Sequence, residues 1–308
     1  RITTWGESHG AAIGVVIDGC PAGLSLSESD IQAFLDRRRP GQSRYTTKRS
    51  ETDQVEILSG IFEGKTTGTP ISLLVRNQDQ RSRDYGEIAS CYRPGHADYT
   101  FQNKYGFRDY RGGGRTSGRE TIGRVAAGAV ASALLKTLGI ELTAFSKSIG
   151  PVTVPESEYR LDEVTENPLY MPNNGLAKKA ADYLNEMMEQ KDSCGGIIEC
   201  RVTGLPVGLG EPVFDKLDAQ LSKGIMSIGA VKAVEIGDGF LAAASNGSTN
   251  NDAFAVQDGQ MIKRTNHSGG VLGGISDGSE LIVRAAIKPT PSIARPQSTV
   301  NIDKEEKH

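Results

Sequence analysis

Glycine is the most constraining feature of this sequence, because it makes up 37 of the 308 residues. That is about 12%, against roughly 7% in average proteins. Glycine enters left-handed backbone conformations freely and lets two chain segments approach closely. The composition therefore predicts a fold with many tight turns, and a chain of this length can bury a sizeable core.

Charge and hydropathy exclude several classes of protein. The 35 Lys and Arg residues against 38 Asp and Glu give a formal net charge of −3, so no overall positive field favours nucleic acid or an acidic membrane. The longest nearly apolar run, residues 125–135, is shorter than the roughly 20 residues of a membrane span. Four cysteines without a C-x-x-C pair predict reduced thiols and a cytoplasmic protein. A start at Arg1 and a charged end predict that the natural chain continues beyond both ends.

Hydrophobic periodicity predicts the main elements. Apolar residues at three- and four-residue spacing predict helices over 27–38, 119–138, 176–189 and 213–228. Ser27 is expected to cap the first helix, and Ser117 with Glu120 has the S-x-x-E pattern of a capping box. The loose alternation of strands and helices favours an α+β or layered α/β fold over a strict βα repeat. The predicted strands are 12–17, 71–75, 196–202, 231–236 and 280–287.

The pattern G-x-P-x-G-L occurs twice, at residues 19–24 and 204–209. Each copy follows a predicted strand and precedes a predicted helix. This predicts a duplicated element, with related units near 8–40 and 193–228 around a pseudo-symmetric core; chance recurrence of a turn motif is the alternative. Length allows about two domains, but no linker separates the halves, so we expect a single interlocked domain over 1–308.

Three histidines lie in short, polar, glycine-containing loops: His9, His96 and His267. Their spacing does not resemble a zinc site, so no metal is expected. Imidazoles titrate near neutral pH, which suits them to proton transfer. A structural role for any one of these histidines is the alternative.

Arginine is concentrated in two stretches. Residues 37–49 hold six basic residues and no acid, and residues 81–124 hold eight arginines against five acids. A solvated basic face is one explanation. The other is a pocket for a polyanion, since guanidinium groups bind carboxylates and phosphates through paired hydrogen bonds. Three glycines at 112–114 lead into a predicted helix start between Arg115 and Arg119, an arrangement that favours an anion.

Two other functions are compatible with single features of the chain. Residues 6–10 match the G-x-S-x-G pattern, which would make Ser8 the nucleophile of a serine hydrolase, although that motif requires a helix after it and a strand is predicted there. The arginine-rich stretches would also suit a nucleic-acid-binding module, whose affinity would fall steeply with salt.

Motifs along nearly the whole chain resemble chorismate synthase. They are RITTWGESHG at 1–10, RRRPGQSR at 37–44, RPGHADY at 93–99, GGGRTSGRET at 112–121, SIGAVK at 227–232 with GDGF at 237–240, NHSGG at 266–270 with GG at 273–274, and KPTPSI at 288–293. The resemblance implies a layered β-α-β sandwich with a pseudo-symmetric core of two related antiparallel sheet and helix units, assembled as a homotetramer.

The resemblance also implies an activity. Members of this family are lyases of the shikimate pathway, which serves aromatic amino acid biosynthesis. They convert 5-enolpyruvylshikimate 3-phosphate, a small phosphorylated molecule, to chorismate and phosphate by anti-1,4-elimination, and they require reduced FMN. Whether NADPH also reduces the flavin on this protein is left open. Neither nucleic acid nor a membrane is an implied partner.

Site residues carry over from the same motifs. His9 would protonate the leaving phosphate and His96 would tune the protonation of the reduced flavin, while Ser8 and Ser117 would assist proton movement and hold the flavin. The implied substrate-binding residues are Arg38, Arg44, Arg93 and Arg119. The implied FMN contacts are Arg115, Thr116, Ser117, Gly229, Ala230, Gly273, Lys288, Pro289, Thr290, Pro291 and Ser292.

The sequence departs from the family pattern in three places. Thr116 replaces the usual serine and keeps its hydroxyl. Gly118 replaces the usual alanine, which weakens the helix start by up to about 1 kcal/mol. The family's C-terminal Gly-Arg-His-Asp-Pro segment, which supplies a flavin-phosphate arginine and a catalytic carboxylate, does not occur in these 308 residues.

Overall fold

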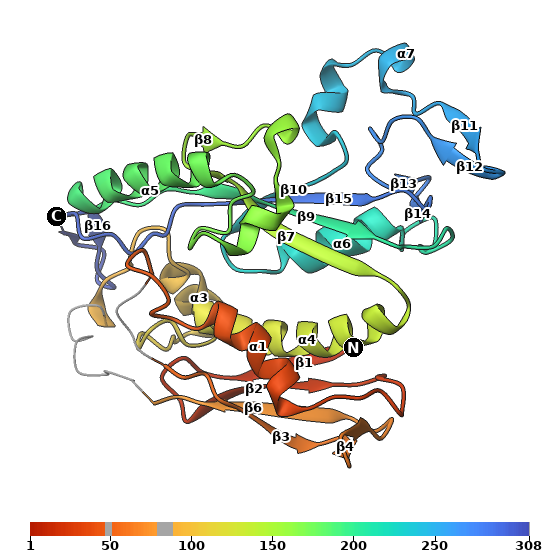
Figure 1. The fold of residues 1–308 in the computed structure, drawn as a ribbon. Coiled ribbons are helices and arrows are strands. Elements are labelled where there is room, and N and C mark those ends of the chain that lie inside the picture. Colours follow the sequence, from red (N-terminus) through yellow and green to blue (C-terminus); the bar gives the residue numbers. More distant parts are fainter. Residues whose placement is uncertain (47–50, 79–88, 308) are drawn as a thin grey trace. The chain divides into compact units, whose positions relative to one another are not determined.

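The computed structural model describes residues 1–46, 51–78 and 89–307. The chain divides into two compact units, of which unit 1 comprises Arg1–Leu135 with Ala294–His308 and unit 2 comprises Lys136–Ile293. Both units contain sheets and helices (Figure 1), so the α+β prediction is confirmed. That the two units form one interlocked domain stays a prediction.

Unit 1 is built on a four-stranded antiparallel sheet in the order β1-β2-β6-β3. Helices α1 and α4 lie along one face of this sheet (Figure 1). Alternate apolar residues of β2 and β6 pack with both helices in one hydrophobic cluster, which explains the amphipathic pattern of the helices. The elements of this unit are β1 (Ile2–Gly6), β2 (Ala12–Ile17), α1 (Glu28–Arg38), β3 (Val55–Ser59), β4 (Ile61–Phe62), β5 (Lys65–Thr66), β6 (Ile71–Arg76), α3 (Asp98–Tyr105), α4 (Thr121–Thr137), β16 (Thr299–Val300) and β17 (Glu306–Lys307).

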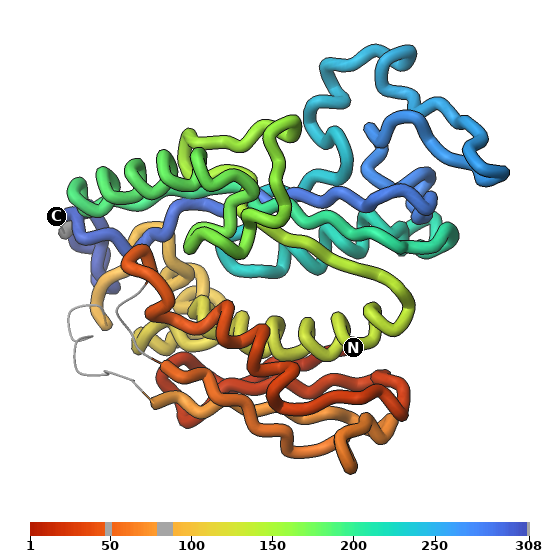
Figure 2. The backbone as a smooth tube through the Cα atoms, in the orientation of Figure 1, coloured from red at the N-terminus to blue at the C-terminus, as the bar shows by residue number. Residues whose placement is uncertain are grey.

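Unit 2 is built on a five-stranded antiparallel sheet in the order β10-β15-β9-β7-β8. The segment between β10 and β13, which includes α7 and the β11–β12 hairpin, loops away from this sheet (Figure 2). The elements are β7 (Glu141–Ile149), β8 (Val152–Thr153), α5 (Asn174–Glu189), β9 (Gly196–Thr203), α6 (Leu217–Met226), β10 (Val231–Ile236), α7 (Gly247–Asn250), β11 (Phe254–Gln257), β12 (Gln260–Lys263), β13 (Val271–Leu272), β14 (Ile275–Ser276) and β15 (Leu281–Ile287).

The two sheets share their strand order. The neighbours β1-β2-β6-β3 of unit 1 correspond in chain order to β7-β9-β15-β10 of unit 2. In unit 1, the first G-x-P-x-G-L copy is fixed by the hydroxyl of Thr66. That oxygen accepts a hydrogen bond from the amide of Leu24 at 2.9 Å and donates to the carbonyl of Pro21 at 2.6 Å.

The second G-x-P-x-G-L copy makes the same contacts in unit 2. The hydroxyl of Ser276 accepts from the amide of Leu209 at 2.9 Å and donates to the carbonyl of Pro206 at 2.6 Å. Both hydroxyl residues end the second strand of a short hairpin, β4–β5 in one unit and β13–β14 in the other. The repeated sequence pattern therefore corresponds to a repeated structural contact.

Most predicted elements are present, with some changes at their ends. Ser27 caps α1 as expected, since its hydroxyl accepts a hydrogen bond from the amide of Asp30. The helix predicted to begin at residue 213 begins at Leu217 instead, because the amide of Glu211 donates to the carbonyl of Asp215 and closes a turn there.

All four cysteines lie in the described part of the chain and are free thiols, as predicted. Among the described residues, no helix has both the length and the apolar character needed to cross a membrane.

Candidate functional site

His9 lies in the tight turn between β1 and β2. The amide of Gly10 donates to the carbonyl of Glu7 at 3.0 Å, and Ser8 is buried beneath the turn. The side-chain amide of Asn77 donates to the carbonyls of Glu7 at 2.9 Å and Gly10 at 2.8 Å. One side chain thus holds both ends of the turn. Strand β2 follows it, which does not fit the strand–turn–helix context that a hydrolase nucleophile requires.

The three-glycine run packs against this turn. A methyl group on Gly112 would lie 2.2 Å from Cε1 of His9, and one on Gly114 would lie 2.9 Å from a carboxylate oxygen of Glu7. Gly112 also has φ +66°, in the left-handed region. Two motifs separated by about a hundred residues therefore come together, and glycine at 112 makes room for the imidazole.

Arg38 and Arg119 share one buried carboxylate. Nη1 of Arg38 lies 2.8 Å from Oδ2 of Asp53, and Nη2 of Arg119 lies 3.1 Å from Oδ1 of the same residue. Nε of Arg119 donates to Oδ1 of Asn77 at 3.0 Å. Asn77 therefore links Arg119 to the turn that holds His9, and Asp53 links Arg38 to Arg119.

Arg93 and His96 lie in the loop before α3. Nε and Nη2 of Arg93 bind the two carboxylate oxygens of Asp98 at 2.7 and 2.8 Å. Burial raises the pKa of Asp98, but the hydrogen bonds from Arg93 and the charges of Arg93 and Arg108 outweigh burial and hold that pKa below its ordinary value. Nδ1 of His96 lies 3.0 Å from the carbonyl of Pro94, which orients the imidazole.

Arg115 binds the backbone of β1. Its Nη1 donates to the carbonyl of Gly6 at 2.9 Å, and its Nη2 donates to Oγ1 of Thr4 at 2.6 Å. Oγ1 of Thr116 donates to the carbonyl of Gly113 at 2.7 Å. These contacts fix the 3₁₀ helix Gly114–Thr116 beside the end of β1.

The predicted capping box between Ser117 and Glu120 is wrong. The hydroxyl of Ser117 accepts from the amide of Arg119 and begins the 3₁₀ helix Gly118–Glu120, so that α4 starts only at Thr121. The carboxylate of Glu120 accepts from Oγ1 of Thr4 at 2.7 Å instead, because β1 runs beside this segment.

A cavity of about 170 Å³ opens beside the glycine run. Burial raises the pKa of Glu7, one of its lining residues, while nearby Arg115 opposes this shift and Asp109 adds to it. The residues that line the cavity include Glu7, Phe101, Tyr105, Asp109, Arg115 and Thr116. The cavity wall therefore combines aromatic rings with charged side chains.

Arg44 stands apart from this group. Its side chain is exposed and donates to the hydroxyl of Tyr45 at 2.9 Å, with the guanidinium 5.0 Å from the centre of the Tyr45 ring. Arg37 and Arg39 are also exposed. Lys48 and Arg49, which belong to the same basic stretch, lie outside the described residues.

The remaining predicted FMN contacts lie in unit 2. Gly229 and Ala230 connect α6 to β10, and Ala230 has φ +72°. The amide of Lys288 donates to the carbonyl of Ala230 at 2.9 Å, so these two predicted segments are neighbours. Gly273 lies in the turn of the β13–β14 hairpin. Pro289, Thr290, Pro291 and Ser292 follow β15, and the carbonyl of Thr290 accepts from the hydroxyl of Ser193.

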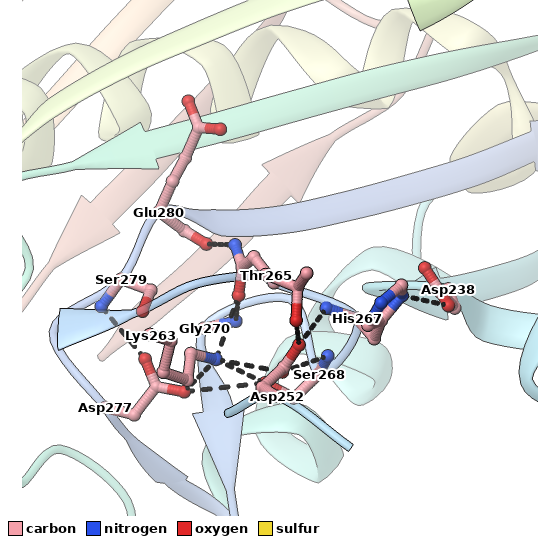
Figure 3. A network of polar contacts seen from close by, with 11 residues as sticks. Asp238, Asp252, Lys263, Thr265, His267, Ser268, Gly270, Asp277, Ser279 and Glu280 are labelled. Atoms are coloured by element: carbon pink, nitrogen blue, oxygen red, sulfur yellow. Dashed lines mark hydrogen bonds and ion pairs between the residues drawn. The ribbon is translucent and has the colours of Figure 1, made fainter. Parts of the chain in front are cut away.

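His267 belongs to a polar network of unit 2 (Figure 3). Its Nδ1 lies 2.8 Å from a carboxylate oxygen of Asp238, and its amide donates to Asp252. The buried ammonium of Lys263 lies 3.3 Å from Asp252 and 2.7 Å from Asp277. These groups hydrogen-bond and pair with one another within the loop, so the network stabilises the loop.

In the described ranges 1–46, 51–78 and 89–307, no group of three or more His, Cys, Asp or Glu side chains could hold a metal ion.

The family model of chorismate synthase matches residues 1–308. The chain belongs to the chorismate synthase family. It is 64% identical over 301 residues to a chorismate synthase of Agathobacter rectalis, with 98% of this chain and 82% of that relative covered. A chorismate synthase of Lachnoclostridium phytofermentans is 65% identical over 302 residues with the same coverage.

A solved structure gives the same result for the fold. The crystal structure of a chorismate synthase matches 94% of this chain and 85% of the solved chain, with a TM-score of 0.80 and 34% sequence identity. As a member of the chorismate synthase family, the chain is a lyase of the shikimate pathway.

Proposed function

We propose that this chain converts 5-enolpyruvylshikimate 3-phosphate to chorismate and phosphate by anti-1,4-elimination, with reduced FMN as cofactor. One observation carries the proposal: Asn77 and Asp53 join the turn of His9 to the pair Arg38 and Arg119. The turn that holds His9 and the two guanidinium groups thereby belong to one network of hydrogen bonds and ion pairs.

The charges of this network suit the substrate, which has one phosphate and two carboxylates. Arg38 and Arg119 share the single negative charge of Asp53, so one positive charge remains to attract an anion. Guanidinium groups bind such anions through paired hydrogen bonds. Arg93 would add its charge, although its Nε and Nη2 bind Asp98, and Arg44 would bind from its exposed position.

His9 would donate a proton to the departing phosphate, which lowers the charge that develops on the leaving oxygen. The imidazole packs against Gly112, where a side chain would leave it no room. Ser8 and Ser117 would assist movement of this proton. His96, oriented by the carbonyl of Pro94, would tune the protonation of the flavin.

The residues proposed to hold FMN fit a flat aromatic group. Arg115 and Thr116 line a cavity together with Phe101 and Tyr105, and glycine at 113 leaves that wall without a side chain. When bound, the reduced flavin would supply an electron-rich ring beside the substrate. The other proposed contacts are Ser117, Gly229, Ala230, Gly273, Lys288, Pro289, Thr290, Pro291 and Ser292.

We also propose a layered β-α-β sandwich that arose by duplication, a homotetramer and a cytoplasmic location. The shared strand order and the matching Thr66 and Ser276 contacts support the duplication.

The experiment is an anaerobic assay of the full-length protein with chemically reduced FMN and 5-enolpyruvylshikimate 3-phosphate. We expect chorismate and phosphate in equal amounts, and no product with oxidised FMN alone. Replacing the chemical reductant with NADPH tests whether the protein reduces its own flavin. Absence of chorismate in the assay with reduced FMN would refute the proposed activity.

A further inference from the structure

Asp53 places a fully buried carboxylate between two arginines. Its side chain has 0% exposure, and each of its oxygens faces one guanidinium group, that of Arg38 at 2.8 Å and that of Arg119 at 3.1 Å. A buried charge is tolerated when it is paired in this way. The carboxylate therefore sets the distance between the two guanidinium groups.

The backbone fixes Asp53 independently of the arginines. Its φ is +46°, in the left-handed region that Asp and Asn enter more readily than other non-glycine residues. The side chain of Gln32 holds the segment at two points, by donating to the carbonyl of Asp53 at 3.3 Å and by accepting from the amide of Val55 at 3.0 Å. The carboxylate is thus a fixed point to which the arginines adjust.

Each arginine has a further partner. Nη2 of Arg38 donates to the carbonyl of Gly118 at 3.2 Å, and Nε of Arg119 donates to Asn77 at 3.0 Å. Nε of Arg38 also donates to Oγ1 of Thr121 at 3.3 Å. These contacts restrict the rotation of both guanidinium groups before any ligand binds. Binding then loses less side-chain freedom, which increases affinity for a ligand whose anions match the spacing.

We propose that Asp53 is a positioning residue, which holds Arg38 and Arg119 at the spacing of two anionic groups on one substrate molecule. This inference rests on the proposed function, because that function makes both arginines substrate-binding. Asp53 contributes spacing rather than attraction, since its own charge opposes anion binding. The proposal therefore predicts different effects on two ligands. 5-Enolpyruvylshikimate 3-phosphate needs both arginines at this spacing, whereas inorganic phosphate needs only positive charge.

The test measures two dissociation constants by titration calorimetry, for 5-enolpyruvylshikimate 3-phosphate and for inorganic phosphate, with wild-type protein and Asp53→Asn. Asn keeps the size of the side chain and suits the backbone φ. Its amide oxygen can accept from one arginine, but its NH₂ group repels the other. We expect the constant for the substrate to rise at least tenfold, while that for inorganic phosphate stays unchanged or falls.

The matched control is Glu199→Gln in unit 2. Glu199 is also a fully buried carboxylate, with Nε of Arg201 and Nε of Arg284 each 2.8 Å from it. We expect this variant to bind both ligands like the wild type. An equal loss of substrate binding in Glu199→Gln would overturn the proposal, because any neutralised buried carboxylate would then have the same effect.

Other outcomes are equally decisive. Unchanged substrate affinity in Asp53→Asn, or equal weakening for both ligands, overturns the inference and leaves the proposed function intact. A wild-type protein that does not bind the substrate overturns the proposed function, and the inference with it. Should Asp53→Asn fail to fold, Gln32→Ala tests the same placement with the carboxylate retained, and unchanged substrate affinity in that variant overturns the inference.

Discussion

Asn77 accepts a hydrogen bond from Nε of Arg119 at 3.0 Å while its NH₂ group binds the two carbonyls that bracket the turn of His9. Asn77 directly follows β6, whose pairing with β2 places Arg76 opposite Ala12. The register of the sheet thus brings Asn77 to the turn. One side-chain amide connects the turn of the proposed proton donor to a proposed substrate-binding arginine. Its NH₂ group faces the carbonyls of the turn and its oxygen faces the guanidinium group.

This arrangement predicts that Asn77→Asp impairs both turnover and substrate binding. The variant keeps an oxygen for Arg119 but replaces the NH₂ group by a second oxygen, which repels the carbonyls of Glu7 and Gly10. We expect kcat to fall by roughly 10- to 100-fold because His9 is displaced, and KM for the phosphorylated substrate to rise, because the new carboxylate offsets the positive charge of Arg119. Steady-state kinetics checks this; a raised KM with unchanged kcat would contradict it.

Gly112→Ala should act on the same imidazole from the other side. The added methyl group would lie 2.2 Å from Cε1 of His9, and alanine at φ +66° costs about 1–2 kcal/mol. We expect turnover to fall by roughly 100-fold, the size expected for His9→Ala when the imidazole donates a proton. The assay of chorismate formation measures both variants, and the double variant should be no slower than His9→Ala alone.

Gly118→Ala is the matched control for Gly112→Ala. A methyl group on Gly118 has no atom within 4 Å, and alanine stabilises a helical turn by up to about 1 kcal/mol relative to glycine. We therefore expect unchanged turnover and an equal or higher free energy of unfolding. Equal loss of activity in both glycine variants would mean that the whole segment 112–118, rather than the His9 contact, is sensitive to substitution.

Sequence patterns predicted the strands and helices whose apolar residues form a continuous run or recur at helical spacing. Strands β2 and β10 have the bounds that their β-branched runs predicted, and the amphipathic α1 begins at its capping serine. Strand β7 was missed, because polar residues such as Glu141 and Lys147 interrupt its apolar positions. Strand β3 was missed as well; its place in the sheet comes from pairing with β6, which no local pattern encodes.

The candidate site was predictable only in part. His9 and Arg119 stand in glycine-rich motifs, and those motifs are visible in the sequence. Asp53 and Asn77 have no such neighbours, and their role arises because β3, β6 and β2 pair side by side. The sequence likewise did not predict that Arg93 binds Asp98 or that Arg115 binds the backbone of β1. A guanidinium group predicted to bind a ligand can instead hold a carboxylate or a strand, and only tertiary structure distinguishes the two.

The ion pair of Asp98 predicts a pH-dependent stability. Burial raises the pKa of Asp98 but its bonds with Arg93 outweigh this, and the pKa in the folded protein lies below the ordinary 3.8. The ionised carboxylate therefore stabilises the fold above that value, and the contribution is lost as pH falls through the folded pKa. We expect Asp98→Asn to lower the free energy of unfolding by about 2 kcal/mol at pH 7.

Urea unfolding from pH 7 to pH 3 checks this prediction. The difference between wild type and Asp98→Asn should stay constant down to about pH 5 and shrink below about pH 4. A difference that is as large at pH 3 as at pH 7 would show that the shape of the side chain, rather than its charge, stabilises the loop before α3.

The paired hydroxyls of the two units lead to the last prediction. Thr66→Val and Ser276→Ala each remove a buried hydroxyl that serves one backbone amide and one carbonyl. Leaving a buried backbone group without a partner costs about 1–3 kcal/mol, so we expect a loss of that size in each variant, measured by urea unfolding. Thr69→Val, at an exposed threonine of the same region, should change stability by less than about 0.5 kcal/mol. Because the same contact fixes each G-x-P-x-G-L copy, a large loss in one unit and none in the other would contradict its equivalence.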